Sequence, residues 1–295
     1  MSPGEEFPKL RMAQRESAEE IERRIQKERR ATDTQREGDL QDSLAPFRVG
    51  SVPYLNSVPL TRGLEDQILF APPSQLATLL RQGELDAALV SITEALLNDH
   101  YDILDGIAVA SLGEVKSVFL AHRKPLAEVQ TVACDTASLT SVNLLRVLLG
   151  EQGLKPKFEP LTDYAATASQ DFVLLIGNPA IDFLRSNPEH AIWDLGTAWY
   201  ELTKLPFVYA AWTLRRGIEN TRLRRLLREA RDFGMDTLDY LIQNRTDYDL
   251  DFRKDYLGWH IHYHLGTDEK RGIAKFQELL ERHGQGPVYP IHYVN

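Results

Sequence analysis

Several features that define whole classes of proteins are missing from this sequence of 295 residues. It has a single cysteine, Cys134, so it cannot form an internal disulfide, and that residue alone cannot make a zinc site. No apolar run approaches the ~18–20 residues that a membrane span needs. Acidic residues outnumber basic ones by 43 to 34, for a formal charge of −9. That balance argues against nucleic acid or an anionic membrane surface as a partner, because both bind basic faces.

The first residues, MSPGEEFPKLRMAQRE, also lack the apolar stretch of a secretory signal. What remains is a composition of 43% hydrophobic and 26% charged residues, which is typical of a globular chain with one or two packed domains. We therefore expect a cytoplasmic protein that acts on a small molecule, with neither a nucleic acid nor a membrane as its partner.

Residues 1–46 differ from the rest of the chain in composition. Twenty of these 46 residues are charged, and Phe7 is their only aromatic residue. Glu19 and Glu20 stand four residues before Arg23 and Arg24, a spacing that supports a helix, but the few apolar residues nearby cannot bury a face. Two interpretations stay open: a helix that docks on a partner, or a solvated and largely disordered N-terminal extension. The composition favours the extension.

From Phe47 onward, short apolar runs alternate with helical periods. Continuous apolar runs suit strands that are buried on both faces of a largely parallel sheet. We predict strands at 47–52, 68–71, 86–90, 107–111, 115–121, 131–135, 171–177 and 206–214. Gly83 and Gly150 each follow leucines at helical spacing and are predicted to end helices, and the chain after Leu214 is mostly helical. The pattern predicts an α/β fold.

Polar side chains follow the predicted strands where such folds bind ligands, at the carboxyl ends of the strands and the N-termini of the helices. These junctions offer hydroxyls, amides and backbone N–H groups, and hardly any charge. One such residue is usually an ordinary helix N-cap. Five junctions together favour a cleft that holds a small carboxylate with neutral donors. The side chains at these junctions include Asn56, Ser91, Ser111, Ser138, Thr140, Ser141 and Asn178.

Seven segments of the chain resemble the chorismate dehydratase family, which opens the futalosine route to menaquinone. They are YLNSVPL at 54–60, DAALVSITEAL at 86–96, ASLGEVKSVFL at 110–120, DTASLTSVNLLRVLL at 135–149, DFVLLIGNPA at 171–180, DLGTAWYELTKLPFVYAAW at 194–212 and GIAKFQELL at 272–280. The resemblance implies a two-lobed class II periplasmic-binding-protein-like fold with a central ligand cleft. Lobe 1 would comprise 47–121 and 207–295, lobe 2 would comprise 122–206, and the crossings would lie near 117–121 and 207–213.

The resemblance also implies a reaction without a cofactor, in which chorismate loses water to give 3-[(1-carboxyvinyl)oxy]benzoate. The family's key amide and hydroxyl fall on Asn56 and Ser91, which can hold and polarise the departing hydroxyl or a carboxylate. Neither is a base near neutral pH without an activating partner, so we hypothesise that a substrate carboxylate removes the proton. The candidate substrate-binding residues are Ser111, Ser138, Thr140, Ser141 and Asn178, the last replacing an acidic residue that the family usually has there.

Two other functions fit the same fold. One is a non-catalytic solute-binding protein for a small carboxylate, which would normally be exported. The other is the related 1,4-dihydroxy-6-naphthoate synthase, whose N-terminal motifs differ from YLNSVPL. Both therefore rank below the dehydratase.

A row of alternating histidines, His260, His262 and His264, is the one pattern that suggests a metal site. Alternate residues share a face of a strand, but only the outer two share a face of a helix. No cysteine or carboxylate lies at a convincing spacing, and the surrounding sequence is typical of a helix end and a turn. We therefore expect no metal. Cys134, inside a predicted strand, is interpreted as a small buried hydrophobic residue.

Overall fold

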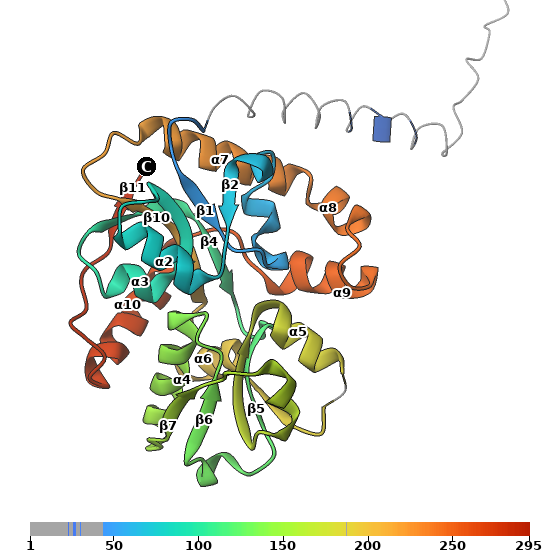
Figure 1. The fold of residues 1–295 in the computed structure, drawn as a ribbon, viewed down its shortest axis with the longest axis vertical. Coiled ribbons are helices and arrows are strands. Elements are labelled where there is room, and N and C mark those ends of the chain that lie inside the picture. The colour runs from blue at the N-terminus through green and yellow to red at the C-terminus, as the bar shows by residue number, and fades with distance from the viewer. Residues whose placement is uncertain (1–22, 24–25, 28–29, 31–43, 187) are drawn as a thin grey trace, which may run out of the picture.

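The protein, described here from a computed structural model, consists of two lobes, each built around one sheet (Figure 1). The structure describes residues 23, 26–27, 30, 44–186 and 188–295. The first lobe contains a six-stranded sheet in the order β11-β4-β10-β3-β1-β2, formed by β1 (Val49–Ser51), β2 (Ile68–Phe70), β3 (Ala87–Ser91), β4 (Tyr101–Ser111), β10 (Phe207–Arg215) and β11 (His292–Val294). The second contains a five-stranded sheet in the order β7-β6-β8-β5-β9, formed by β5 (Val118–His122), β6 (Thr131–Cys134), β7 (Lys157–Pro160), β8 (Phe172–Ile176) and β9 (Ala191–Asp194).

All eight predicted strands are found, although β4 already begins at Tyr101 and β5 begins only at Val118. Each sheet is largely parallel, as predicted, and among the described strands one strand in each sheet runs against the others: β10 in the first and β5 in the second. β1 pairs in parallel with β2 and β3, and β6 does so with β7 and β8. β10 runs antiparallel to both β3 and β4, and β5 runs antiparallel to β8 and β9. The antiparallel strands are the ones with which the chain enters a sheet after leaving the other lobe. Their direction follows from that passage, and a pattern of local apolar runs does not reveal it.

Helices cover both sheets and account for the periodic segments of the sequence. They are α2 (Pro73–Arg81), α3 (Ile92–Leu96), α4 (Leu139–Glu151), α5 (Gly177–Arg185), α6 (Leu195–Thr203), α7 (Thr221–Asp236), α8 (Leu238–Asn244), α9 (Leu250–Asp255) and α10 (Thr267–Arg282). The expected stop at Gly83 is confirmed, since α2 ends just before it. The stop expected at Gly150 is wrong: α4 continues to Glu151, and Gly153 adopts the left-handed φ of +77° beyond it.

Three of the described strands, β7, β9 and β11, were not predicted from the sequence. All three lie at the edge of a sheet, are three or four residues long, and include polar residues. Edge strands are paired on one side only, so their sequences do not need the continuous apolar run that buried strands show. Among the described helices, none combines the length and apolar character of a membrane span.

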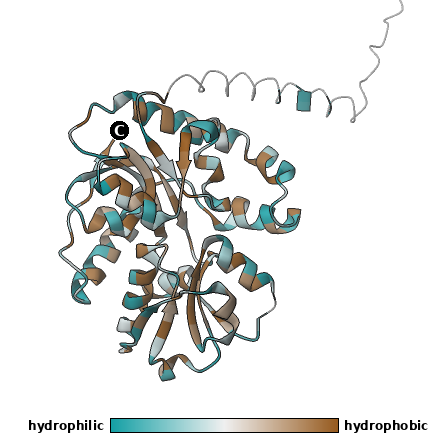
Figure 2. Ribbon diagram, viewed as in Figure 1, coloured by the Kyte–Doolittle hydropathy of each residue, from teal (hydrophilic) through white to brown (hydrophobic). Residues whose placement is uncertain are grey.

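The apolar core is continuous from one lobe into the other. Alternate residues of β5 and β8 point to opposite faces of the second sheet. Leu120 and Leu174 belong to the main core that also fills the first lobe, whereas Phe119 and Val173 form a separate small cluster. At the junction of the lobes, the ring of Trp199 on α6 packs edge-on against Phe207 of β10, with centroids 5.0 Å apart. Figure 2 shows the same division, with hydrophobic strands inside and hydrophilic outer helix surfaces.

The described structure bears on the predicted boundaries of the lobes in two places. The boundary after residue 121 falls within β5, all of which pairs in the second sheet. Within the predicted extension 1–46, the described residues 23, 26–27 and 30 are helical and exposed, and the interpretation of the remainder before Leu44 lies outside the described residues. Leu44, inside that range, is described and fully buried, and its N–H donates to Oε1 of Gln67 at 3.2 Å. We therefore propose that the first lobe includes Leu44 and that the first crossing runs through 112–117.

The thiol of Cys134 should be unreactive in the folded protein. Cys134 lies on β6 with 1% of its surface exposed, and burial raises its pKa to about 12. The thiolate is the reactive form, and little of it exists near neutral pH at such a pKa. We expect Ellman's reagent to release no thionitrobenzoate from the native protein and one equivalent from protein unfolded in guanidinium. Rapid stoichiometric reaction of the native protein would contradict this prediction.

Candidate active site

A small cavity of about 50 Å³ lies where the two lobes meet. Four of the seven predicted site residues line it, namely Asn56 and Ser91 from the first lobe and Ser138 and Ser141 from the second. Asn56 is in the 3₁₀ helix η1 (Leu55–Leu60) that follows β1, and Ser91 is the last residue of β3. Junctions that are far apart in the sequence therefore meet at one point, as expected for the carboxyl ends of strands.

Three of these hydroxyls are in direct contact across the lobes. Ser91 Oγ lies 3.1 Å from Ser138 Oγ, and Ser141 Oγ donates to Ser138 Oγ at 3.2 Å. Ser138 is the N-cap of α4, where its hydroxyl accepts from the backbone N–H of Ser141. Ser138 therefore caps α4 and lines the cavity at the same time, because its Oγ accepts the capping bond and also contacts the other hydroxyls.

The other three predicted residues lie off the cavity and bond to protein groups. Thr140 Oγ1 accepts from the N–H of Thr93 at 2.9 Å, and Asn178 Oδ1 accepts from the N–H of Leu55 at 3.3 Å. Both bonds connect one lobe to the other. Ser111 donates to the carbonyl of Gly113 at 2.9 Å and lies 3.1 Å from the Tyr209 hydroxyl. The binding of substrate by these three side chains stays a prediction.

Sequence reasoning missed three further polar residues that line the cavity: Tyr54, Tyr209 and Ser117. Burial, and then the charge of Asp135, raise the pKa of Tyr54 to about 12, and burial raises the pKa of Tyr209 well above its ordinary value. Both phenols are therefore neutral hydrogen-bonding groups near neutral pH. Tyr54 stands two residues before Asn56 and could have been found from that proximity, whereas Tyr209 lies within an apolar strand.

No carboxylate, imidazole, guanidinium or ammonium group is among the described residues that line this cavity. Asp194, which does not line the cavity, binds backbone groups next to it. Asp194 caps α6 by accepting from the N–H of Thr197 at 2.9 Å, and it also binds the N–H groups of Val115 and Lys116 in the first crossing. Burial raises the pKa of Asp194 in spite of these bonds. Neutral donors and helix termini are therefore what the cavity offers to an anion.

Two helices of the second lobe begin at the cavity. Ser138 and Ser141 belong to the start of α4, and Gly177 is the first residue of α5. The N-terminus of a helix carries a partial positive charge and unpaired N–H groups, so it suits a carboxylate. Gly177 has a φ of +59°, and a Cβ there would be 3.2 Å from the ring of Tyr54. A glycine is needed for this close approach of the lobes.

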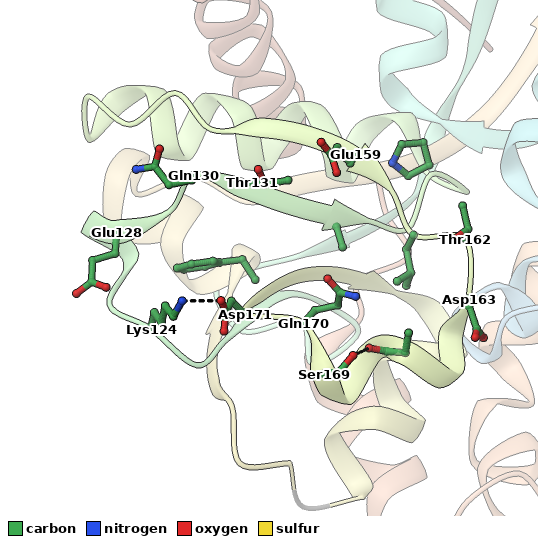
Figure 3. A pocket seen from close by; sticks show the side chains of 15 residues that line it. Lys124, Glu128, Gln130, Thr131, Glu159, Thr162, Asp163, Ser169, Gln170 and Asp171 are labelled. Carbon is green, nitrogen blue, oxygen red and sulfur yellow. Dashed lines mark hydrogen bonds and ion pairs between the residues drawn. The ribbon is translucent and has the colours of Figure 1, made fainter.

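Volume alone does not identify the site. A larger cavity of about 470 Å³ opens on the second lobe, where the Lys124 ammonium binds the Asp171 carboxylate at 2.7 Å (Figure 3). None of the predicted site residues lines it. Its walls carry charges of both signs, on an open surface away from the junction of the lobes.

The histidine row acquires a carboxylate that the sequence did not indicate. The fold brings Glu269 of α10 next to His262 and His264, so that three possible ligand atoms lie within 4.8 Å of one another. Glu269 already has two partners: Oε2 accepts from the N–H of Gly266 at 2.9 Å, and Oε1 lies 3.1 Å from Nε2 of His264. We assign the group to the N-terminal cap of α10.

Comparison with known proteins identifies the family and the fold of the chain. Residues 47–282 match the family model described as menaquinone biosynthesis. A chorismate dehydratase from Thermus thermophilus is 35% identical over 85% of this chain and 99% of its own length. Among solved structures, protein AF1704 from Archaeoglobus fulgidus superposes with a TM-score of 0.65 at 19% identity, covering 81% of this chain and 97% of that one. The alkanesulfonate-binding protein SsuA from Xanthomonas axonopodis gives 0.59 at 14%, covering 82% and 94%.

The two solved structures show the fold, a two-lobed α/β architecture like that of periplasmic binding proteins, as the family resemblance implied. The family model covers most of the chain, and the Thermus relative is matched over nearly its whole length. The chain therefore belongs to the chorismate dehydratase family of menaquinone biosynthesis.

Proposed function

We propose that this protein is a carbon–oxygen lyase that removes water from chorismate to give 3-[(1-carboxyvinyl)oxy]benzoate. The observation that carries the proposal is the cavity between the lobes, whose polar groups are hydroxyls, an amide and helix N-termini. Such a lining suits a substrate with two carboxylates and a hydroxyl that must leave. Membership of a family of biosynthetic enzymes supports the same reading and a cytoplasmic location.

The residues that line the cavity also limit which group can act as the base that removes the ring proton of chorismate. Loss of the ring hydroxyl and of the proton on the neighbouring ring carbon leaves an aromatic ring, and the two together make water. The described lining holds no group that is a base near neutral pH, since both of its phenols have raised pKa values. We propose that a carboxylate of the substrate removes the proton and that the protein acts by orientation.

Six of the seven predicted site residues then have a role that follows from their position. Asn56 and Ser91, on the first lobe, act on the departing hydroxyl. Ser138 and Ser141, with the N-terminus of α4, bind a carboxylate from the second lobe. Thr140 and Asn178 bond to the first lobe in the closed structure, so we assign them to closure.

The direct test is to incubate the purified full chain with chorismate and to follow the product by mass and ultraviolet spectrum. We expect a product lighter than chorismate by one water, with the spectrum of an enolpyruvyl benzoate, and no requirement for an added cofactor. Binding of chorismate without any conversion would overturn the proposal in favour of a solute-binding protein.

The closed cleft predicts a movement. A cavity of about 50 Å³ has room for only a few water molecules, so a ten-carbon acid can enter only if the lobes separate. A dianion that bridges both lobes should then favour the closed arrangement. We expect small-angle X-ray scattering to give a smaller radius of gyration with saturating product than without. Superimposable profiles would count against hinge closure.

A further inference from the structure

Tyr256 is a fully buried residue that stands behind the cavity. It begins the π-helical turn η5 (Tyr256–His260), directly after α9, and its ring stacks on Phe252 with centroids 5.4 Å apart. Its hydroxyl donates to Ser117 Oγ at 2.8 Å. Burial raises the pKa of the phenol, and hydrogen bonding by the side chains of Ser117 and Asn56 beside it opposes that rise. The turn thus reaches two residues that line the cavity and that come from distant parts of the chain.

The direction of these bonds is set by the number of hydrogens. A phenol has one hydrogen, and Tyr256 gives it to Ser117. Toward Asn56 the phenol oxygen can therefore only accept, so Asn56 must present its Nδ2–H group to Tyr256. The Asn56 carbonyl oxygen is then left for the cavity, and the amide cannot flip without losing a bond.

Ser117 is oriented by the same argument. Its oxygen accepts from Tyr256, and the contacts of the described residues give the hydrogen of its own hydroxyl no acceptor. That hydrogen is available to the cavity, which Ser117 lines although the residue is fully buried. The three groups form one directed chain, from Asn56 through Tyr256 to Ser117, in which each bond strengthens the next.

We propose that Tyr256 is a positioning residue for the dehydration: it orients the Asn56 amide and the Ser117 hydroxyl so that the cavity offers one acceptor and one donor side by side. The inference rests on the proposed function. The substrate hydroxyl can bond to both groups, because it donates its hydrogen to an acceptor such as the Asn56 carbonyl and its oxygen accepts a hydrogen from a donor such as the Ser117 hydroxyl. As the C–O bond breaks, oxygen gains charge, and the Ser117 donor then stabilises the transition state more than the bound substrate.

The test replaces Tyr256 with phenylalanine, which keeps the ring and removes only the hydroxyl. We expect kcat to fall roughly tenfold to a hundredfold, as for small misplacements of reacting groups, while KM and the affinity for product change little. Tyr263→Phe is the matched control. Tyr263 is also buried, and its hydroxyl has no partner among the described residues, so this variant should keep the wild-type kcat.

A double-mutant cycle separates positioning from a merely structural role. If Tyr256 acts through Asn56 and Ser117, Tyr256→Phe should cost far less in an Asn56→Ala or a Ser117→Ala background than in the wild type. Equal costs in all backgrounds, or a wild-type kcat for Tyr256→Phe, would overturn the inference. If Tyr256→Phe does not fold, Ser117→Ala tests the inference by itself. A wild-type kcat in Ser117→Ala would show that the Ser117 hydroxyl is not the donor, and the inference would be overturned. Absence of turnover in the wild type would instead overturn the proposed function.

Discussion

Alanine at Asn56 or at Ser91 is expected to lower the turnover of chorismate about a hundred- to thousand-fold, which corresponds to ~2.7–4 kcal/mol in the barrier. Both side chains line the cavity from the first lobe, and both are assigned to the hydroxyl whose charge changes during the reaction. The Ser91 hydroxyl can donate to an oxygen that gains charge in the transition state, and the Asn56 carbonyl fixes the orientation of the hydroxyl that leaves. Both effects act on kcat rather than on affinity. Turnover at saturating chorismate and product affinity by calorimetry are the two measurements.

Two comparisons make this result specific. Ser138→Ala should mainly weaken product binding, because we assign Ser138 to a carboxylate that the reaction does not change. Asn244→Ala and Ser169→Ala remove the same kinds of side chain from exposed positions away from the cleft, and they should keep the wild-type rate. Wild-type turnover in both Asn56→Ala and Ser91→Ala would mean that these residues are structural.

Substitution of Gly234 by alanine is expected to destabilise the protein by about 1–3 kcal/mol. Gly234 lies on α7, where this helix packs against η1, and a Cβ there would be 1.8 Å from the carbonyl oxygen of Pro59. Neither backbone can yield without moving its whole element. Since η1 also carries Asn56, the shift should lower turnover as well as the midpoint of urea unfolding.

Gly258→Ala provides the control for this prediction. A Cβ at Gly258 would meet only Cδ1 of Ile242, at an ordinary distance of 3.8 Å. Alanine is favoured over glycine in helical conformation, so this variant should be as stable as the wild type or slightly more so. If Gly234→Ala unfolds at the same urea concentration as Gly258→Ala, the packing of α7 on η1 is looser than the structure indicates.

The elements that could be predicted from the sequence are those that are buried along their whole length, because consecutive apolar residues identify them. Strands such as β3 and β8, buried along their whole length, were found for this reason. The edge strands and the antiparallel course of β10 were not, because they depend on pairing with residues far along the chain. The same distinction explains the end of α4: Gly150 is tolerated within the helix, and the left-handed turn falls on Gly153.

The candidate site divides in a similar way. Position after a strand placed Asn56, Ser91, Ser138 and Ser141 at the carboxyl ends of the strands, and all four line the cavity. It was not enough to decide which hydroxyls face the cavity. Ser111 ends β4 as Ser91 ends β3, yet the Ser111 hydroxyl bonds to Gly113 and Tyr209. Tyr256 could not be found at all, because a buried phenol in a helical segment has no local signature.

The position of β10 has a consequence for the order in which the molecule is built. β10 separates β3 from β4 in the first sheet, and Ala210 pairs with Ser91 although the whole second lobe lies between them in the sequence. During synthesis the first sheet cannot be completed until β10 has left the ribosome, because β3 and β4 pair with β10 and not with each other. The second sheet, whose strands are consecutive in the sequence, can form earlier. Refolding should therefore show a fast phase for the second lobe and a slower one in which β10 inserts.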